Sequence, residues 1–108
     1  MTEKTTLPRM NWHRLMIEAR AYPDGSSYAQ RCVATYTPGQ AVVVGPAYQS
    51  GGLYAHDSHC GRYYVVRRLT DSQDYYLARH PEDVVTGDWA LICHASRLRL
   101  AVGDDSIV

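Results

Sequence analysis

The sequence predicts a mainly β fold, a small β-barrel of short strands preceded by a short helix or hairpin. Two observations carry this prediction. Residues Ala41–Val44 are dense in strand-forming side chains and are bracketed by the turn signals Pro38-Gly39 and Gly45-Pro46. Further along, the runs Arg62–Leu69 and Tyr75–Arg79 are separated by a short polar turn, which is the pattern of a β-hairpin.

Length and composition indicate one globular domain. The chain has 108 residues, of which 45% are hydrophobic and 20% charged, close to the average of folded proteins. Residues 1–9 are polar and are predicted to be a flexible tail, and residues 103–108 a second one. We therefore expect a single domain over 10–102, with the barrel core at about 28–102.

The segment before the barrel has two interpretations. Asn11 is a good helix cap, and Trp12, Leu15 and Met16 follow it at the spacing of one helix face. Alternatively, 15–22 pairs as a strand with 28–36 through the turn Pro23-Asp24-Gly25. Leu, Met, Glu, Ala and Arg favour the helix, but the sequence leaves both open.

The remaining elements follow from alternation and turn residues. The predicted elements are a first strand at Ala29–Tyr36, an irregular loop at Pro46–Gly61, a loop at Pro81–Asp88, a strand at Trp89–His94 and a last strand at Arg97–Ala101. In the last strand, alternation predicts Leu98 and Leu100 inside and Arg97 and Arg99 outside. We expect Trp89→Ala to cost several kcal/mol, roughly 3–5 if the ring is fully buried.

This order of elements resembles the small SH3-like barrel modules of bacterial and phage proteins. The residues that carry the resemblance are Pro38–Val44, Gly61–Val66, Tyr75–Leu77 and Trp89–Leu100. The resemblance implies a five-stranded, partly open barrel that serves as a binding platform, and it implies no particular ligand. The acidic loop and aromatic groove motif of the SH3 domains that bind proline-rich peptides are not found in this sequence.

The net charge argues against one class of function, and the cysteine content indicates the cellular compartment. Basic and acidic residues number 11 each, so the formal net charge is zero, which argues against a dedicated binder of nucleic-acid backbones. The three cysteines are widely spaced, and the first residues lack the layout of a signal peptide. We therefore expect a cytoplasmic protein whose cysteines are reduced and which is not associated with a membrane.

The candidate binding surface is an Arg/Tyr cluster on the predicted hairpin. Arginine and tyrosine are enriched in binding hot spots, and alternation places one Tyr of each doublet on the outer face beside an Arg. The predicted partner-binding residues are Tyr63, Tyr64, Arg67, Arg68, Tyr76 and Arg79. The function we expect is non-catalytic protein binding, as in an adaptor or inhibitor encoded by a phage or mobile element. A nucleic-acid-binding barrel is the alternative, and ordinary cross-strand packing explains the same residues without any partner.

A second alternative is a small zinc-binding protein. His56, His59 and Cys60 are close in sequence, with Cys93 or His94 available to complete a tetrahedral set. Adjacent residues of a strand point to opposite faces, however, and this favours a polar surface loop and no cofactor. Cys60 or Cys93 with His59, His80 or His94 as a base is the enzymatic reading. Nothing in the sequence brings such a pair together, so we expect no catalytic activity.

Overall fold

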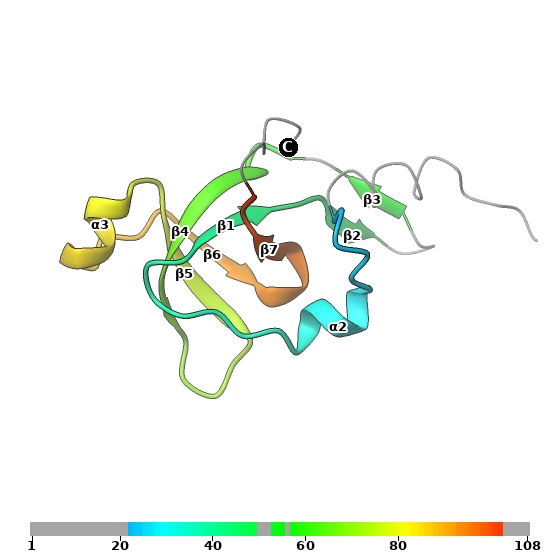
Figure 1. The fold of residues 1–108 in the computed structure, drawn as a ribbon, viewed down its shortest axis with the longest axis horizontal. Coiled ribbons are helices and arrows are strands. Elements are labelled where there is room, and N and C mark those ends of the chain that lie inside the picture. The colour runs from blue at the N-terminus through cyan, green and yellow to red at the C-terminus, as the bar shows by residue number, and fades with distance from the viewer. Residues whose placement is uncertain (1–21, 50–52, 56, 103–108) are drawn as a thin grey trace, which may run out of the picture.

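The computed structural model describes residues 22–49, 53–55 and 57–102, and the predicted helix at 11–22 lies almost entirely outside them. The described part is mainly β (Figure 1). The elements are α2 (Tyr28–Cys32), β1 (Ala41–Val44), β2 (Ala47–Gln49), β3 (Leu53–Ala55), β4 (Gly61–Arg68), β5 (Asp74–Ala78), α3 (Pro81–Thr86), β6 (Leu91–His94), the 3₁₀ turn η2 (Ala95–Arg97) and β7 (Leu98–Leu100).

Five strands form one antiparallel sheet in the order β6-β5-β4-β1-β7, so β6 and β7 are its two end strands. The sequence prediction of a hairpin is confirmed by β4 and β5, which pair Tyr64 with Ala78 and Arg68 with Tyr75. The register shifts between Val65 and Arg67, which is the signature of a β-bulge. A separate two-stranded hairpin, β2–β3, occupies the segment predicted as an irregular loop.

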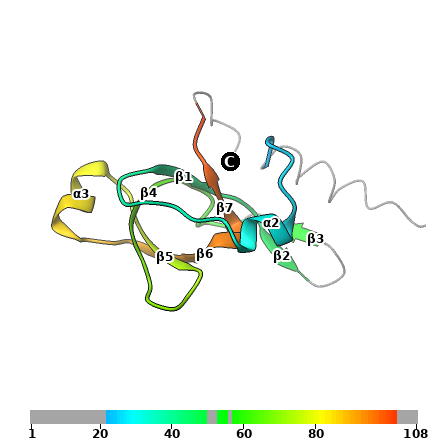
Figure 2. The same cartoon turned by 60° about the horizontal axis from the view of Figure 1, so that its bottom comes forward.

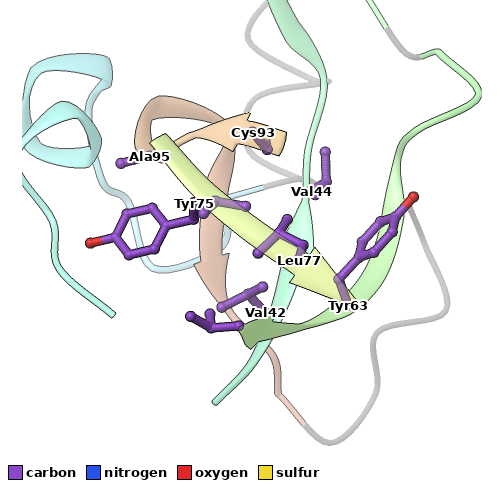
Figure 3. Close-up of a cluster of buried hydrophobic side chains, with 9 residues drawn as sticks. Val42, Val44, Tyr63, Tyr75, Leu77, Cys93 and Ala95 are labelled. Atoms are coloured by element: carbon purple, nitrogen blue, oxygen red, sulfur yellow. The ribbon is translucent and has the colours of Figure 1, made fainter. Parts of the chain in front are cut away.

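The core lies on one face of the curved sheet (Figure 3). Because side chains alternate along a strand, every second residue of the central strands points to this face. The core cluster consists of Val42, Val44, Tyr63, Val65, Tyr75, Leu77, Cys93, Ala95 and Leu98. Gly45 directly follows β1. A Cβ atom at this position would lie 2.6 Å from the Tyr22 hydroxyl oxygen, so only glycine leaves room for the Tyr22 ring beside the strand.

The first predicted strand, Ala29–Tyr36, is wrong, because its first half is the helix α2. Ser27 caps this helix: its side chain accepts the Gln30 N–H, and the Gln30 side chain accepts the Ser27 N–H. The hairpin reading of the N-terminal segment fails for the same reason, since its second strand would run through α2. Helix α2 packs against η2, while α3 lies at the opposite end of the sheet (Figure 2).

Three further predictions are corrected. The loop predicted at Pro81–Asp88 contains α3, which starts with Pro81 and ends at Gly87 in the left-handed conformation (φ 80°). The strand predicted at Trp89–His94 begins only at Leu91. In β7, Leu98 is buried as predicted, but Arg99 is 3% and Leu100 51% exposed. Arg99 pairs with Val43, which is also buried, so this part of the sheet is covered on both faces.

Candidate interaction site on the outer face of the sheet

One row of side chains crosses three strands on the face opposite the core. Arg67 of β4 is the register partner of Tyr76 of β5, and Tyr76 is the partner of Ile92 of β6. Paired residues of antiparallel strands point to the same face, so the three side chains lie side by side. Their neighbours in sequence, such as Tyr75 and Cys93, point into the core instead.

Trp89 extends this row into an exposed patch. The Arg67 guanidinium carbon lies 4.3 Å from the centre of the Tyr76 ring, and the Tyr76 and Trp89 rings are 4.9 Å apart at an angle of 48°. Trp89 is 52% and Ile92 43% exposed. We call Arg67, Tyr76, Trp89 and Ile92 the outer patch. It combines a cation, two aromatic rings and an aliphatic side chain in contact with solvent.

Local sequence explains why Trp89 lies outside the core. Helix α3 ends at Gly87, whose left-handed backbone turns the chain back toward the sheet. The Asp88 N–H then bonds to the Asp83 carbonyl, and the Ala90 N–H to the Leu77 carbonyl. Trp89 therefore sits in the connection between α3 and β6, before regular strand pairing begins, and its ring leans on Tyr76.

The predicted partner-binding residues separate into two groups. Arg67 and Tyr76 belong to the outer patch, and Tyr64 lies half-buried on the same face with the Arg62 guanidinium 6.0 Å from its ring. Arg68 is the last residue of β4, Arg79 directly follows β5, and both side chains are exposed. Tyr63 is only 1% exposed, so the structure places it in the core and not on the surface.

Sequence reasoning missed two members of the outer patch. The sequence prediction places Ile92 in a strand without assigning it to a face, and it places Trp89 in the same strand, with a cost of truncation of roughly 3–5 kcal/mol if the ring is fully buried. The signal that identifies Trp89 was present: Pro81 and Gly87 mark the start and end of a helix, so the residues after Gly87 form a connection. The exposed side of Ile92 follows only from its register with Tyr76.

Two of the proposed zinc ligands, His59 and Cys60, lie in the turn 57–60. Arg97 Nη2 donates to Asp57 Oδ1 at 3.0 Å and lies 3.7 Å from Cys60 Sγ, while the His59 N–H donates to the same carboxylate. Burial alone would raise the pKa of Asp57, but hydrogen bonds from Arg97 and from the His59 N–H hold it below its ordinary value. His56 lies outside the described residues. Within the described ranges no three His, Cys, Asp or Glu side chains are grouped as a metal site requires.

Among the described residues, no hydrogen bond joins the sulfur of Cys60 or Cys93 to an imidazole ring. Cys93 points into the core, and burial raises the pKa of its thiol to about 12, so it is protonated near neutral pH. His94 Nδ1 accepts the Ser96 N–H and contacts the Ser96 hydroxyl at the start of η2. The described contacts of Cys60 Sγ are with Asp57 and Arg97, and none of them is with an imidazole ring.

A cleft of about 610 Å³ lies along β7 and is lined mainly by apolar side chains, among them Pro23, Leu100 and Val102. Its two charged residues already have protein contacts: Asp24 Oδ1 accepts the Ser26 N–H, and Arg99 Nη1 donates to the Leu100 carbonyl. The outer patch, where an Arg, two aromatic rings and an Ile reach solvent together, is the stronger candidate for recognition.

Comparisons with protein-family models, with curated proteins and with solved structures gave no significant match. In the part of the chain that the structure describes, no helix has the length and apolar content needed to cross a membrane.

Proposed function

We propose that the protein is a non-catalytic protein-binding module, built on a partly open SH3-like barrel, that acts as an adaptor or inhibitor. One sheet of five antiparallel strands that is not closed, with β6 and β7 at its two ends, supports a partly open barrel. The partner docks on the outer patch. The observation that carries the proposal is the exposed contact chain Arg67–Tyr76–Trp89.

The chemistry of the patch defines the partner. Trp, Tyr and Arg are the residue types that dominate binding hot spots, because a rigid ring or guanidinium buries much area at low entropic cost. The exposed sides of Trp89 and Ile92 fit an apolar side chain of the partner. The exposed arginines Arg62, Arg67, Arg68 and Arg79 on β4 and beside β5 favour carboxylates around it.

A protein partner is favoured over single-stranded nucleic acid. Stacking of successive bases needs several open aromatic faces, and in the outer patch Trp89 alone offers one, because the Tyr76 ring already lies against Arg67 and Trp89. A nucleic-acid binder also uses a wide basic surface, whereas this chain has a formal net charge of zero.

The test is a comparative pull-down from lysate of the source cells, run with and without nuclease, with quantitative mass spectrometry. Three tagged proteins are compared: the wild type, the double variant Arg67→Ala/Trp89→Ala, and Val33→Ala as a control. Val33 is 71% exposed and lies just after α2, apart from the outer patch. We expect one protein to be recovered equally by wild type and control and at least tenfold less by the folded double variant. Equal recovery by the double variant would contradict the proposal, as would a partner that is captured only without nuclease.

A further inference from the structure

The 3₁₀ turn η2 is capped at its start by a histidine ring. His94 Nδ1 accepts the Ser96 N–H at 3.1 Å and lies 2.9 Å from the Ser96 hydroxyl oxygen. A ring nitrogen accepts a hydrogen bond only through its lone pair, so Nδ1 carries no proton in this arrangement. The His94 ring is therefore neutral, with its proton on Nε2, as long as the cap is formed.

The capped turn joins several parts of the fold. It connects β6 to β7, the two end strands of the sheet, and its residues Ala95 and Ser96 are buried. The Ser96 carbonyl accepts Arg31 Nε of α2 at 2.8 Å, and the Arg97 carbonyl accepts the Gly45 N–H at 2.7 Å. The position of η2 therefore determines how α2 and the end of β1 meet the sheet.

Protonation of the ring removes this cap. An imidazolium ion has an N–H group at both ring nitrogens and no acceptor, so His94 Nδ1 would present a donor to the Ser96 N–H. The Ser96 hydroxyl can rotate and accept from the protonated ring, but the backbone N–H has no such freedom. Ser96 is 9% exposed, so an N–H without an acceptor there is costly. Histidine changes its charge between about pH 8 and 5, so the cap depends on pH in this range.

Charged groups face His94 from the elements around it. On β5, Asp74 is its register partner, so its carboxylate lies on the same face of the sheet. Arg97 of η2 is paired with Asp57, and Arg31 reaches η2 from α2. The carboxylates favour the imidazolium and the guanidinium groups oppose it, so their effects act in opposite directions. None of these charges restores the lone pair that a protonated Nδ1 has lost.

From these contacts we propose that His94 is a pH-sensitive switch in the connection between the two end strands. The neutral ring holds η2 in place, and the protonated ring releases the Ser96 N–H and can turn toward Asp74. The cap therefore stabilises the fold above the pH at which histidine gains its proton and is lost as the pH falls. The proposal concerns the fold and does not rest on the proposed function, because no residue of the outer patch takes part.

Two substitutions separate the effect of the proton from that of the cap. Asparagine is a good N-cap whose side-chain oxygen accepts a hydrogen bond at any pH in this range, whereas alanine does not cap. We expect the unfolding constant of the wild type, relative to His94→Asn, to rise about fivefold from about pH 7.5 to about pH 5.5, the factor typical of one N-cap. The ratio of His94→Asn to His94→Ala should stay constant, because neither side chain titrates.

Urea denaturation of the three proteins at the two pH values measures these ratios. All other titratable groups are the same in the three proteins, so their contributions largely cancel. A change of less than about twofold in the ratio of the wild type to His94→Asn would overturn the proposal, since the cap would then not depend on the proton.

NMR of the wild type keeps the proposal testable if a variant does not fold. The nitrogen signals of the imidazole ring show which ring atom carries the proton. At about pH 7.5 we expect His94 Nδ1 to be unprotonated, and on acidification the Ser96 amide signal should shift in step with protonation of the ring. A proton on Nδ1 at about pH 7.5, or a Ser96 amide signal that does not follow the ring, would overturn the proposal.

Discussion

The two end strands of the sheet are treated differently by the rest of the chain. Along β7, side chains from distant segments bind backbone carbonyls: the Tyr36 hydroxyl donates to Leu98 and Arg31 Nε donates to Ser96 in the preceding turn. Arg97 donates from the same turn to the Gly45 carbonyl. Along β6, the described residues supply no comparable side-chain cover, and Ile92 and Trp89 face solvent.

The difference shows that a small sheet can have one end strand covered by side chains and the other exposed to solvent. Buried carbonyls must be paired with donors, so the β7 side requires Arg and Tyr side chains with well-defined positions. The β6 side has no such requirement, because its outward groups can bond to water or to another strand. Stability should therefore depend mainly on the β7 side and recognition on the β6 side, and the following variants test this division.

The largest effect is expected for Arg31→Ala, which opens the β7 side. Arg31 is 2% exposed, its Nη1 donates to the Ser26 carbonyl, and its guanidinium lies 3.5 Å from the centre of the Tyr22 ring. Losing two charge-assisted hydrogen bonds and a buried side chain should lower the free energy of unfolding by about 3–5 kcal/mol. Urea denaturation measures this, with exposed Arg68→Ala as a control that should change stability by less than about 0.5 kcal/mol. A loss below about 1 kcal/mol would contradict a stabilising role of Arg31.

A smaller, pH-dependent effect is expected at Tyr36, which binds the edge of β7 directly. Burial raises the pKa of Tyr36 from its ordinary value of 10.0 to about 12. As the pH rises, Tyr36 therefore ionises in the unfolded chain before it does so in the folded protein. Its contribution to the free energy of unfolding is complete below pH 10 and is lost as the pH rises to about 12.

The difference in unfolding free energy between the wild type and Tyr36→Phe should shrink over this range, by an amount on the order of 2 kcal/mol. Denaturation series at several pH values measure it. Other groups, including Cys93, titrate in both proteins and largely cancel. A difference that stays constant up to pH 12 would show that the hydroxyl is not buried.

The smallest effect on stability is expected on the β6 side, for Trp89→Ala. The ring is 52% exposed and contacts Tyr76, so its loss should cost about 1 kcal/mol and not the 3–5 typical of buried tryptophan. Thermal unfolding checks this against Leu77→Ala, whose fully buried side chain should cost about 2–5 kcal/mol. Equal losses for the two variants would remove the contrast between the edges.

Part of what the structure shows was readable from local signals. The central strands and the β4–β5 hairpin follow from strand-forming runs bounded by turn residues. Ser27 and Gln30 form a capping-box pattern, and Pro81 and Gly87 bracket a helix, so α2 and α3 were also predictable. These capping residues correct the strand predicted at 29–36 and the loop predicted at 81–88.

The candidate site was predictable only in part. The sequence placed Arg67 and Tyr76 together, because the hairpin brings their strands side by side. It could not add Trp89 or Ile92, which reach the patch through the packing of a third strand. Nor could it show that Tyr63 lies in the core, since alternation alone does not decide which Tyr of a doublet faces inward.

The sequence alone determined the class of the fold, because strand propensity, alternation and turn residues act over a few neighbouring positions. Only the tertiary structure decided which end strand is covered. Arg31 contacts a carbonyl 65 residues away, and Tyr36 one that is 62 residues away. Contacts at such separations depend on how the whole chain folds back on itself, so no local pattern assigns Arg31 to the interior or leaves Ile92 on an open edge.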